Sequence, residues 1–507
     1  MLMGLMLTGL MGACTRYGWP MSTRARSARI LSRALALLAA LVTVPAMADE
    51  ALDESLRALI TKQNLSGKAA FSESHPALED PSVLLGRELF FSKVLSGDND
   101  AACASCHHPF MAGGDALSLA VGVAANEPDR LGLGRTFDWQ SRGAKDPHAA
   151  AGPNVPRNSP TIINVGLYQK TVFHDGRLEQ RRFGSIRSPE SVRDQGRDLM
   201  AVQARLPVVA EDEMQGYRLL RFATPDRVRD TLVERLREDW PERFARAFGD
   251  AKAGPESVTY ERIELALSDY QRSFVLIDNP WFNYVAGDRE AIGASAKRGA
   301  RDFLSSKSEG GLGCAACHQG DFFTDEKFHA AGFPQIGRGI KRPAAGYGNE
   351  TQRDGTDGGR WEVTRRSRDR YAFRTPSLLN VTTTAPYAHA GTHATLEDLI
   401  AYHLDPPTGA AAFDFSLQHL PQFKNRTINY PKARAETAAA VAAWRTTGIT
   451  PQALSPERMR DLVAFLQTLT DPCIASRPCM EPWMPDASEV VEGRLDAIID
   501  PQQLVAR

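Results

Sequence analysis

The pattern of apolar and polar positions along the chain predicts a mostly helical protein. Apolar residues recur every three or four positions in five stretches. These stretches are residues 81–95, 225–249, 259–276, 395–404 and 455–469. The last two begin with Thr395 and Ser455, each followed by an acidic residue in the first turn, which is typical of a helix N-terminus. No convincing run of alternating apolar and polar residues predicts a strand.

The N-terminal residues have the pattern of a secretory signal. From Met21, four arginines precede an apolar run at 35–44 and an A-M-A sequence that ends at Ala48. We expect translation to begin at Met21 and cleavage to follow Ala48, so that 1–48 is a signal region and the mature protein is periplasmic. The apolar run is too short for a stable membrane span. Cys14, at the end of LMGAC, leaves a lipoprotein as the alternative.

Length and charge narrow the class of protein. With 507 residues, the chain is long enough for two or three domains. Its 60 basic and 61 acidic residues nearly cancel, which argues against a nucleic-acid partner. An exported protein of this kind folds where disulfides persist.

Four of the seven cysteines belong to two copies of the motif Cys-x-x-Cys-His. This motif attaches c-type haem: the two thiols bind the vinyl groups of the porphyrin, and the histidine binds the iron. A disulfide, a redox-active cysteine pair or half a zinc site could explain one copy, but two copies favour two haem c groups. The predicted residues are Cys103, Cys106 and His107 for the first haem and Cys314, Cys317 and His318 for the second. Cys473 and Cys479 remain, and they predict a short-loop disulfide.

A weak internal repeat divides the chain. GRELFFSK, from residue 86, precedes the first haem motif at nearly the distance at which GARDFLSSK, from residue 299, precedes the second. The repeat predicts two cytochrome c-like haem domains, interrupted by long irregular loops. Their bounds are 49–285 for the N-terminal domain and 286–480 for the C-terminal domain, with a tail at 481–507. The stretch 330–370 has no periodic apolar face and predicts an irregular surface loop.

Three further stretches resemble the bacterial dihaem cytochrome c peroxidase family, which includes MauG. They are RNSPTIINVGLYQKTVFHDGR (157–177), QARLPVVAEDEM (203–214) and RTPSLLNVTTTAPYAHAGTHATLEDLIAYH (374–403). The resemblance runs in order from about residue 86 to residue 403, with both haem motifs in register. It implies that the first haem is the peroxide site and that the second transfers electrons.

The resemblance places Gln203 and Glu213 in the distal pocket of the first haem. The family spaces a Gln, a Pro and a Glu as Gln203, Pro207 and Glu213 are spaced here. A glutamate in a partly apolar pocket can take a proton from one oxygen of peroxide and give it to the other, and a glutamine can orient the peroxide. The alternative for Glu213 is an exposed loop carboxylate.

Two positions depart from the family pattern around the irons. Where other members have a histidine that blocks the first iron, this sequence has Val123, which cannot bind iron. The first haem is therefore expected to need no reductive activation, unless His148 in the nearby loop reaches the iron. The distal position of the second haem holds His403, with Tyr402 beside it. We expect His403 to bind, and to give a lower reduction potential than methionine would.

The resemblance extends to the region between the haems. The tryptophan of the family is replaced by His174, which either couples the haems or is structural. A Ca²⁺ ion between the domains is a family feature, and the matching positions are Asn158, Thr384 and Pro386, which offer an amide side chain and backbone carbonyls. Beside the first motif, His108 is expected to be exposed.

The predicted function is that of a periplasmic dihaem c-type peroxidase. It would reduce hydrogen peroxide to water with electrons from a small donor protein, a cytochrome c or a cupredoxin. The alternative is a MauG-like enzyme that uses peroxide to oxidise residues of a partner protein. A pure electron-transfer cytochrome is a third reading, but it gives no reason for Gln203 and Glu213. Whether the chain forms a homodimer is left open.

Overall fold

A computed structural model describes nine ranges of the chain. They are residues 50–69, 75–138, 152–189, 198–221, 223–340, 355–426, 428, 430–486 and 493–505. Of the described residues, 50–58 belong to one compact unit and those from 59 onward to another. The predicted signal region, 1–48, and His148 lie outside the described residues. No helix in the described ranges is both long and apolar enough to cross a membrane.

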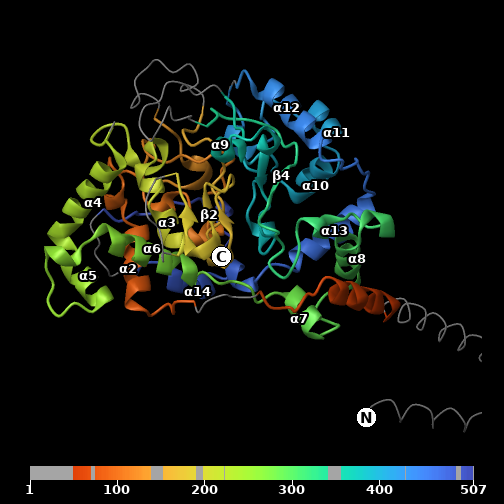
Figure 1. Ribbon diagram of the computed structural model, residues 1–507, viewed down its shortest axis with the longest axis horizontal. Coiled ribbons are helices and arrows are strands. Elements are labelled where there is room, and N and C mark those ends of the chain that lie inside the picture. The colour runs from red at the N-terminus through yellow and green to blue at the C-terminus, as the bar shows by residue number, and fades with distance from the viewer. Residues whose placement is uncertain are drawn as a thin grey trace, which may run out of the picture. The chain divides into compact units, whose positions relative to one another are not determined.

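The helical predictions are confirmed, with one correction (Figure 1). Four of the stretches contain α2 (Pro81–Phe90), α6 (Tyr260–Ser273), α10 (Leu396–Leu404) and α13 (Pro456–Gln467). The stretch 225–249 forms two helices, α4 (Pro225–Asp239) and α5 (Pro241–Phe248), rather than one. Pro241 causes the break, because it has no backbone N–H and its ring clashes with the preceding turn.

Short elements complete the fold. The other helices are α3 (Leu199–Ala204), α7 (Pro280–Ala286), α8 (Ala294–Leu304), α9 (Trp361–Thr364), α11 (Pro406–Ala412), α12 (Ala433–Arg445) and α14 (Arg477–Met480). An antiparallel sheet has the order β1 (Thr171–Val172), β2 (Leu178–Gln180) and β3 (Ile186–Arg187). A second antiparallel pair joins β4 (Phe328–Ala330) to β5 (Ala372–Arg374), with His329 opposite Phe373. The described strands are only two or three residues long, so the fold is mostly α as predicted.

The internal repeat corresponds to two helix crossings. Helix α2 packs against α6, and α8 packs against α13 (Figure 1). A Cβ atom on Gly86 would lie 1.9 Å from the carbonyl oxygen of Ala266, and one on Gly299 would lie 1.9 Å from that of Asp461. Each repeat therefore has its glycine where a second helix comes too close for any side chain. Each crossing then leads directly into the haem motif of its own half.

A second repeated feature, which the sequence analysis missed, lies in the PTIINV and PSLLNV stretches. Asn164 and Asn380 both have left-handed backbone, with φ of 62° and 63°. Both side-chain Nδ2 atoms donate to the carbonyl of Leu276, at 2.8 and 2.9 Å. The two halves of the molecule therefore meet symmetrically at the chain segment that follows α6.

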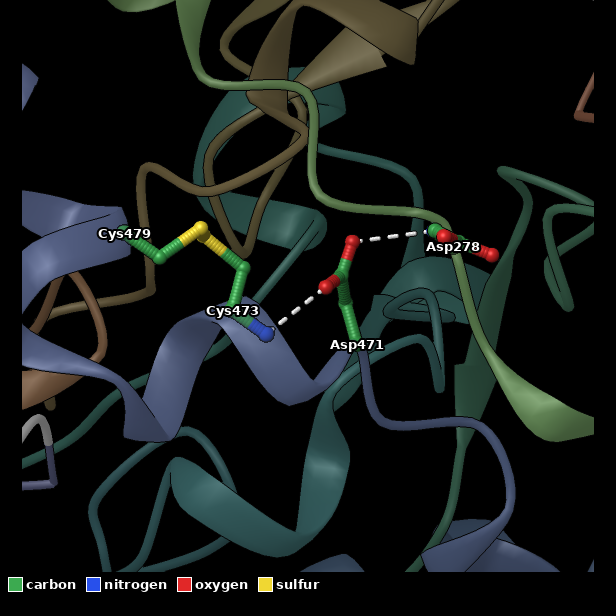
Figure 2. Close-up of a disulfide and its surroundings, with 4 residues drawn as sticks. All are labelled: Asp278, Asp471, Cys473 and Cys479. Carbon is green, nitrogen blue, oxygen red and sulfur yellow. Dashed lines mark hydrogen bonds between the residues drawn. A yellow bond between two sulfur atoms is a disulfide. The ribbon is translucent and has the colours of Figure 1, made fainter.

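The predicted disulfide between Cys473 and Cys479 is confirmed (Figure 2). Just before it, the carboxylate of Asp471 accepts hydrogen bonds from the N–H groups of Cys473 and Asp278, each at 2.9 Å (Figure 2). The disulfide turn is thereby tied to the segment between α6 and α7.

The C-terminal residues pack onto the N-terminal half. Trp483 stacks on Phe274 with ring centroids 5.2 Å apart, and its carbonyl accepts a hydrogen bond from the hydroxyl of Tyr270 at 2.7 Å. Further on, the N–H of Leu495 donates to the carbonyl of Phe91 at 2.8 Å. The described residues of the predicted tail therefore belong to the core around α2 and α6.

Candidate haem centres and the cavity between them

Both haem motifs line one cavity of about 1530 Å³. Pockets for a single small ligand usually measure about 300–1,000 Å³, so the cavity exceeds the space that one such ligand needs. Its walls are mainly apolar, with polar groups at a few positions, as is usual for a cofactor site. The four motif cysteines line it as free thiols.

The first motif forms a tight turn, and its two cysteines and its histidine line the cavity. Residues Cys103–Ser105 are one 3₁₀ turn, and the N–H of His107 donates to the carbonyl of Cys103 at 3.0 Å. Nδ1 of His107 lies 3.3 Å from the carbonyl oxygen of Gly113. Because a carbonyl only accepts, Nδ1 carries the proton and Nε2 keeps its lone pair for a metal. Burial lowers the pKa of His107, which keeps the imidazole neutral.

The second motif repeats this geometry. Cys314–Ala316 form a 3₁₀ turn, and Nδ1 of His318 lies 3.2 Å from the carbonyl oxygen of Phe323. Burial again lowers the pKa of the imidazole. In each half, two thiols and one correctly protonated imidazole face the same apolar space. These donors fit a covalently bound haem c, which the thiols would anchor and the imidazole Nε2 would ligate.

Gln203 and Glu213 lie in the wall of this same cavity. Gln203 comes from α3, and its buried Oε1 has no hydrogen-bond partner among the described residues. Glu213 lies in a π-helical turn, Glu211–Gln215, of the kind that often occurs at functional sites. Loss of hydration raises the pKa of Glu213, and the positive charges of Arg177 and Arg157 oppose the rise. The structure thus brings both predicted distal residues together with His107.

His403 and Tyr402 face different surroundings. His403, in the last turn of α10, lines the cavity, and its ring stacks on Phe333 with centroids 5.4 Å apart and planes 10° apart. Its pKa is lowered to about 4, mainly by desolvation and in addition by the nearby imidazole of His318. Tyr402 is buried, and its hydroxyl donates to the carbonyl of Gly332 at 2.8 Å. Only His403 of the two is therefore placed to serve as a ligand.

Val123 is fully buried in a small apolar cluster with Leu117, Phe137 and Tyr217. It does not line the cavity. The side chain at position 123 therefore cannot bind the first iron. Whether His148 does so stays a prediction, because that residue lies outside the described part of the chain.

Aromatic groups from both halves line the cavity. The rings of Phe373 and His389 stack with centroids 3.8 Å apart. His174 also lines the cavity, with Nε2 3.1 Å from the carbonyl oxygen of Asn158. Burial lowers the pKa of His174 to about 4 and that of His389 to about 3. Both imidazoles are therefore neutral near pH 7, and with Phe373 they form an aromatic wall of the cavity.

A buried network of charges, which the sequence analysis missed, supports this wall. Arg157 forms two hydrogen bonds with the carboxylate of Asp357, at 2.7 and 2.8 Å, and a third with Asp175 at 2.8 Å. Burial alone would raise the pKa of Asp357, but Arg157 outweighs it and lowers that pKa. The prediction that residues 330–370 form a surface loop is wrong at residues 334–339 and 356–360, because both stretches are buried.

The proposed Ca²⁺ positions are close together. Asn158 and Thr384 border one very small cavity together with Asp115, and Pro386 follows two residues after Thr384. Nδ2 of Asn158 donates to the carbonyl of Leu117 at 2.7 Å, so its Oδ1 is the atom that remains for a cation. The donors are oxygen atoms, as Ca²⁺ requires.

The structure corrects the prediction that His108 is exposed. It is 1 % exposed rather than on the surface, and its ring packs edge-on against Phe91 and Phe110. Its Nδ1 accepts a hydrogen bond from the N–H of Phe110 at 3.2 Å. The histidine therefore caps the turn that follows the first haem motif and belongs to the core.

Two cysteine–histidine motifs, one in each half of a helical fold and both lining one cavity, are the arrangement expected of a dihaem c-type cytochrome. Comparison with known proteins supports this description. Residues 80–290 match the family of di-haem cytochrome c peroxidases. The chain is similar to di-haem cytochrome c peroxidases and to MauG, and this similarity implies two haem c groups.

Two relatives and one solved structure give the extent of the similarity. The methylamine utilization protein MauG of Methylorubrum extorquens is 27% identical over 424 residues, which are 83% of this chain and 86% of that protein. Cytochrome c551 peroxidase of Pseudomonas aeruginosa is 28% identical over 359 residues, 70% of this chain and 82% of that one. The crystal structure of a MauG-like protein associated with microbial copper homeostasis has a TM-score of 0.51 and 22% identity, and the match covers 82% of this chain and 98% of that one. The last comparison supports the fold.

Proposed function

We propose that this protein is a periplasmic peroxidase that converts hydrogen peroxide, two protons and two electrons into two molecules of water. The electrons come from a small redox protein, a cytochrome c or a cupredoxin. The observation that carries the proposal is that Glu213 and Gln203 share the cavity of His107. An electron carrier has no use for a partly buried carboxylate and an unpaired amide oxygen at its iron site. The relatives named cytochrome c peroxidase agree with this activity.

The chain's own residues handle the protons and hold the substrate. A haem c bound to the first motif supplies an iron that binds peroxide and exchanges electrons. The Glu213 carboxylate takes the proton from one peroxide oxygen and gives it to the other, which leaves as water. Gln203 orients the peroxide, because its amide lies on the same wall and has hydrogen-bonding capacity to spare. The apolar residues around them exclude bulk water.

The second half of the protein handles electrons. His318 and His403 would hold the second haem iron, and with both imidazoles bound no position would remain there for peroxide. The stacked pair of Phe373 and His389 lines the same cavity as His174, and these groups would take over the role of the tryptophan that His174 replaces. The first haem is thus the site of peroxide chemistry, and the second receives electrons from the donor.

Fully oxidised enzyme is expected to turn over peroxide as fast as enzyme that has first been reduced by one electron. The reason is that Val123 cannot block the first iron and is buried away from the cavity. The measurement is steady-state turnover with a reduced small cytochrome c, with and without pre-reduction. Activity only after pre-reduction would contradict the expectation and would point to His148, and a His148→Ala variant would then restore activity to the oxidised enzyme.

A MauG-like function is the second candidate, and Val123 in place of a blocking histidine favours it. In that case peroxide would drive oxidation of side chains in a partner protein. The same turnover experiment separates the two functions. Negligible oxidation of the small donor, together with peroxide-dependent oxidation of a protein substrate, would favour the MauG-like function. Six-coordinate iron in both halves and no reaction with peroxide would favour a simple electron carrier.

Ca²⁺ is expected to hold the region between the two halves through Asn158, Thr384 and Pro386. Removing it with a chelator should abolish most turnover, and adding Ca²⁺ back should restore it. The physical reason is that Asn158 also contacts the aromatic wall, since its N–H donates to the carbonyl of His389 at 2.9 Å. Turnover that is unaffected by chelation, with no calcium found by metal analysis, would contradict the site.

A further inference from the structure

Residues 121–124 run past the turn that carries Glu213, and buried side chains hold this segment. Arg135 is 2 % exposed, and its guanidinium donates to four backbone carbonyls. Nε donates to Val121 at 2.7 Å, and Nη2 donates to Gly122 at 2.6 Å. Nη1 donates to Pro128 at 2.6 Å and to Arg130 at 3.3 Å. A buried cation whose hydrogen bonds all go to one loop fixes that loop firmly.

Asn154 bridges this segment to the turn of Glu213. It is fully buried, and its Oδ1 accepts a hydrogen bond from the N–H of Gly122 at 3.1 Å. Its Nδ2 lies 3.1 Å from the carbonyl of Val123 and 2.9 Å from the carbonyl of Asp212. The same Nδ2 lies 3.1 Å from the hydroxyl of Tyr217. The amide side chain of Asn154 therefore contacts both backbone segments, residues 121–124 and the turn that carries Glu213.

These two backbone segments also contact each other directly. The N–H of Val123 donates to the carbonyl of Asp212 at 3.2 Å. A Cβ atom on Gly122 would lie 2.2 Å from that carbonyl oxygen and 2.8 Å from the Cα atom of Glu213, so only glycine fits there. The hydroxyl of Tyr217 donates to the Asp212 carboxylate at 2.5 Å, so Tyr217 contacts both Asn154 and the turn that carries Glu213.

We propose that Asn154 is a positioning residue, which ties the 121–124 segment to the π-helical turn and so fixes where the Glu213 carboxylate enters the cavity. Asn154 does not itself line the cavity, so it acts only through that turn. The inference rests on the proposed function, in which Glu213 handles the protons of peroxide. Fixed placement matters because a carboxylate that shifts by about 1 Å can lose on the order of 100-fold in rate.

Asn154→Ala is expected to lower the second-order rate constant for peroxide by on the order of 100-fold. It should also move the acid midpoint of the pH–rate profile down, toward that of an ordinary glutamate, because a loosened turn lets water reach the carboxylate. The pH profile is the decisive readout, since a loss of folding alone would lower the amplitude without moving the midpoint. Haem content and the spectrum of the second haem should stay unchanged.

Two further variants complete the test, one as a control and one as an independent disruption of the same contacts. Asn126→Ala is the matched control, because Asn126 is an exposed asparagine of the same chain segment whose Nδ2 bonds to Thr136 at 2.8 Å. It should leave both rate and midpoint unchanged. Tyr217→Phe keeps the aromatic ring but removes the hydroxyl that contacts Asn154 and Asp212, and it should shift both quantities in the direction of Asn154→Ala. If the Asn154→Ala variant does not fold, Tyr217→Phe tests the positioning role in its place.

The outcomes separate this inference from the proposed function. If Glu213→Gln abolishes the peroxide reaction while Asn154→Ala and Tyr217→Phe both keep the wild-type rate and midpoint, the positioning role of Asn154 is wrong. If Glu213→Gln itself reacts at the wild-type rate, the proposed proton transfer fails and the inference fails with it. A lower rate with a lowered midpoint in Asn154→Ala supports the role.

Discussion

Glu213→Gln is expected to lower the second-order rate constant for peroxide by about 100- to 10,000-fold, which is the range over which a placed acid–base group accelerates a reaction. Glutamine has the size of glutamate and still forms hydrogen bonds, but it cannot accept the proton of peroxide at the pH of the assay. The measurement is stopped-flow mixing of the oxidised enzyme with peroxide. Both haems should remain attached, since neither motif involves Glu213.

The pH dependence provides a second test of the same residue. Burial raises the pKa of Glu213 above the ordinary glutamate value of 4.5, against the opposing charge of Arg177. Only the carboxylate form can accept a proton, so the wild-type rate should fall as the pH decreases through this raised pKa. The acid limb of the profile should therefore lie above pH 4.5 and should disappear in Glu213→Gln.

Glu211→Gln is the matched comparison for this experiment. Glu211 lies in the same π-helical turn and also borders the cavity, but the family spacing assigns the role to Glu213. If Glu211→Gln loses the reaction and Glu213→Gln keeps it, the proton-transfer role belongs two residues earlier. If neither variant is impaired, the cavity contains another base and the proposed mechanism is wrong.

Local patterns in the sequence were enough to predict the parts of the site that local structure creates. The haem motifs, the disulfide and the capped helices α10 and α13 each depend on residues within a few positions of one another. The Gly86 and Gly299 repeats also marked real helix crossings, because a close approach of two helices leaves a glycine in the sequence.

Long-range contacts account for what the sequence analysis missed. Asp357 looked like a loop residue among glycines, and only the fold brings it to Arg157, 200 residues earlier in the chain. The exposure of His108 was predicted wrongly for the same reason, since Phe91 and Phe110 cover it from outside the motif. The hydrogen bond from Asn154 to the carbonyl of Asp212, in the turn of Glu213, joins positions 58 residues apart. No local pattern in the sequence indicates it.

His403→Ala is expected to convert the second haem from low-spin to high-spin, because it removes the ligand opposite His318. His403→Met should keep the haem low-spin and raise its reduction potential, since a thioether favours ferrous iron more than an imidazole does. The measurements are electron paramagnetic resonance of the oxidised protein and a redox titration. Both variants should retain covalent haem, because Cys314 and Cys317 are untouched.

The structure also supplies the control for this experiment. The hydroxyl of Tyr402 already donates to the carbonyl of Gly332, so Tyr402→Phe should leave the spectrum of the second haem unchanged. An unaltered spectrum in His403→Ala, with a changed one in Tyr402→Phe, would reverse the ligand assignment. The stacking of Phe333 on the His403 ring argues against that result, because it holds the imidazole in one orientation along the cavity wall. A ligand fixed in this way lets the second iron change oxidation state with little movement of the protein, as electron transfer from a docked donor requires.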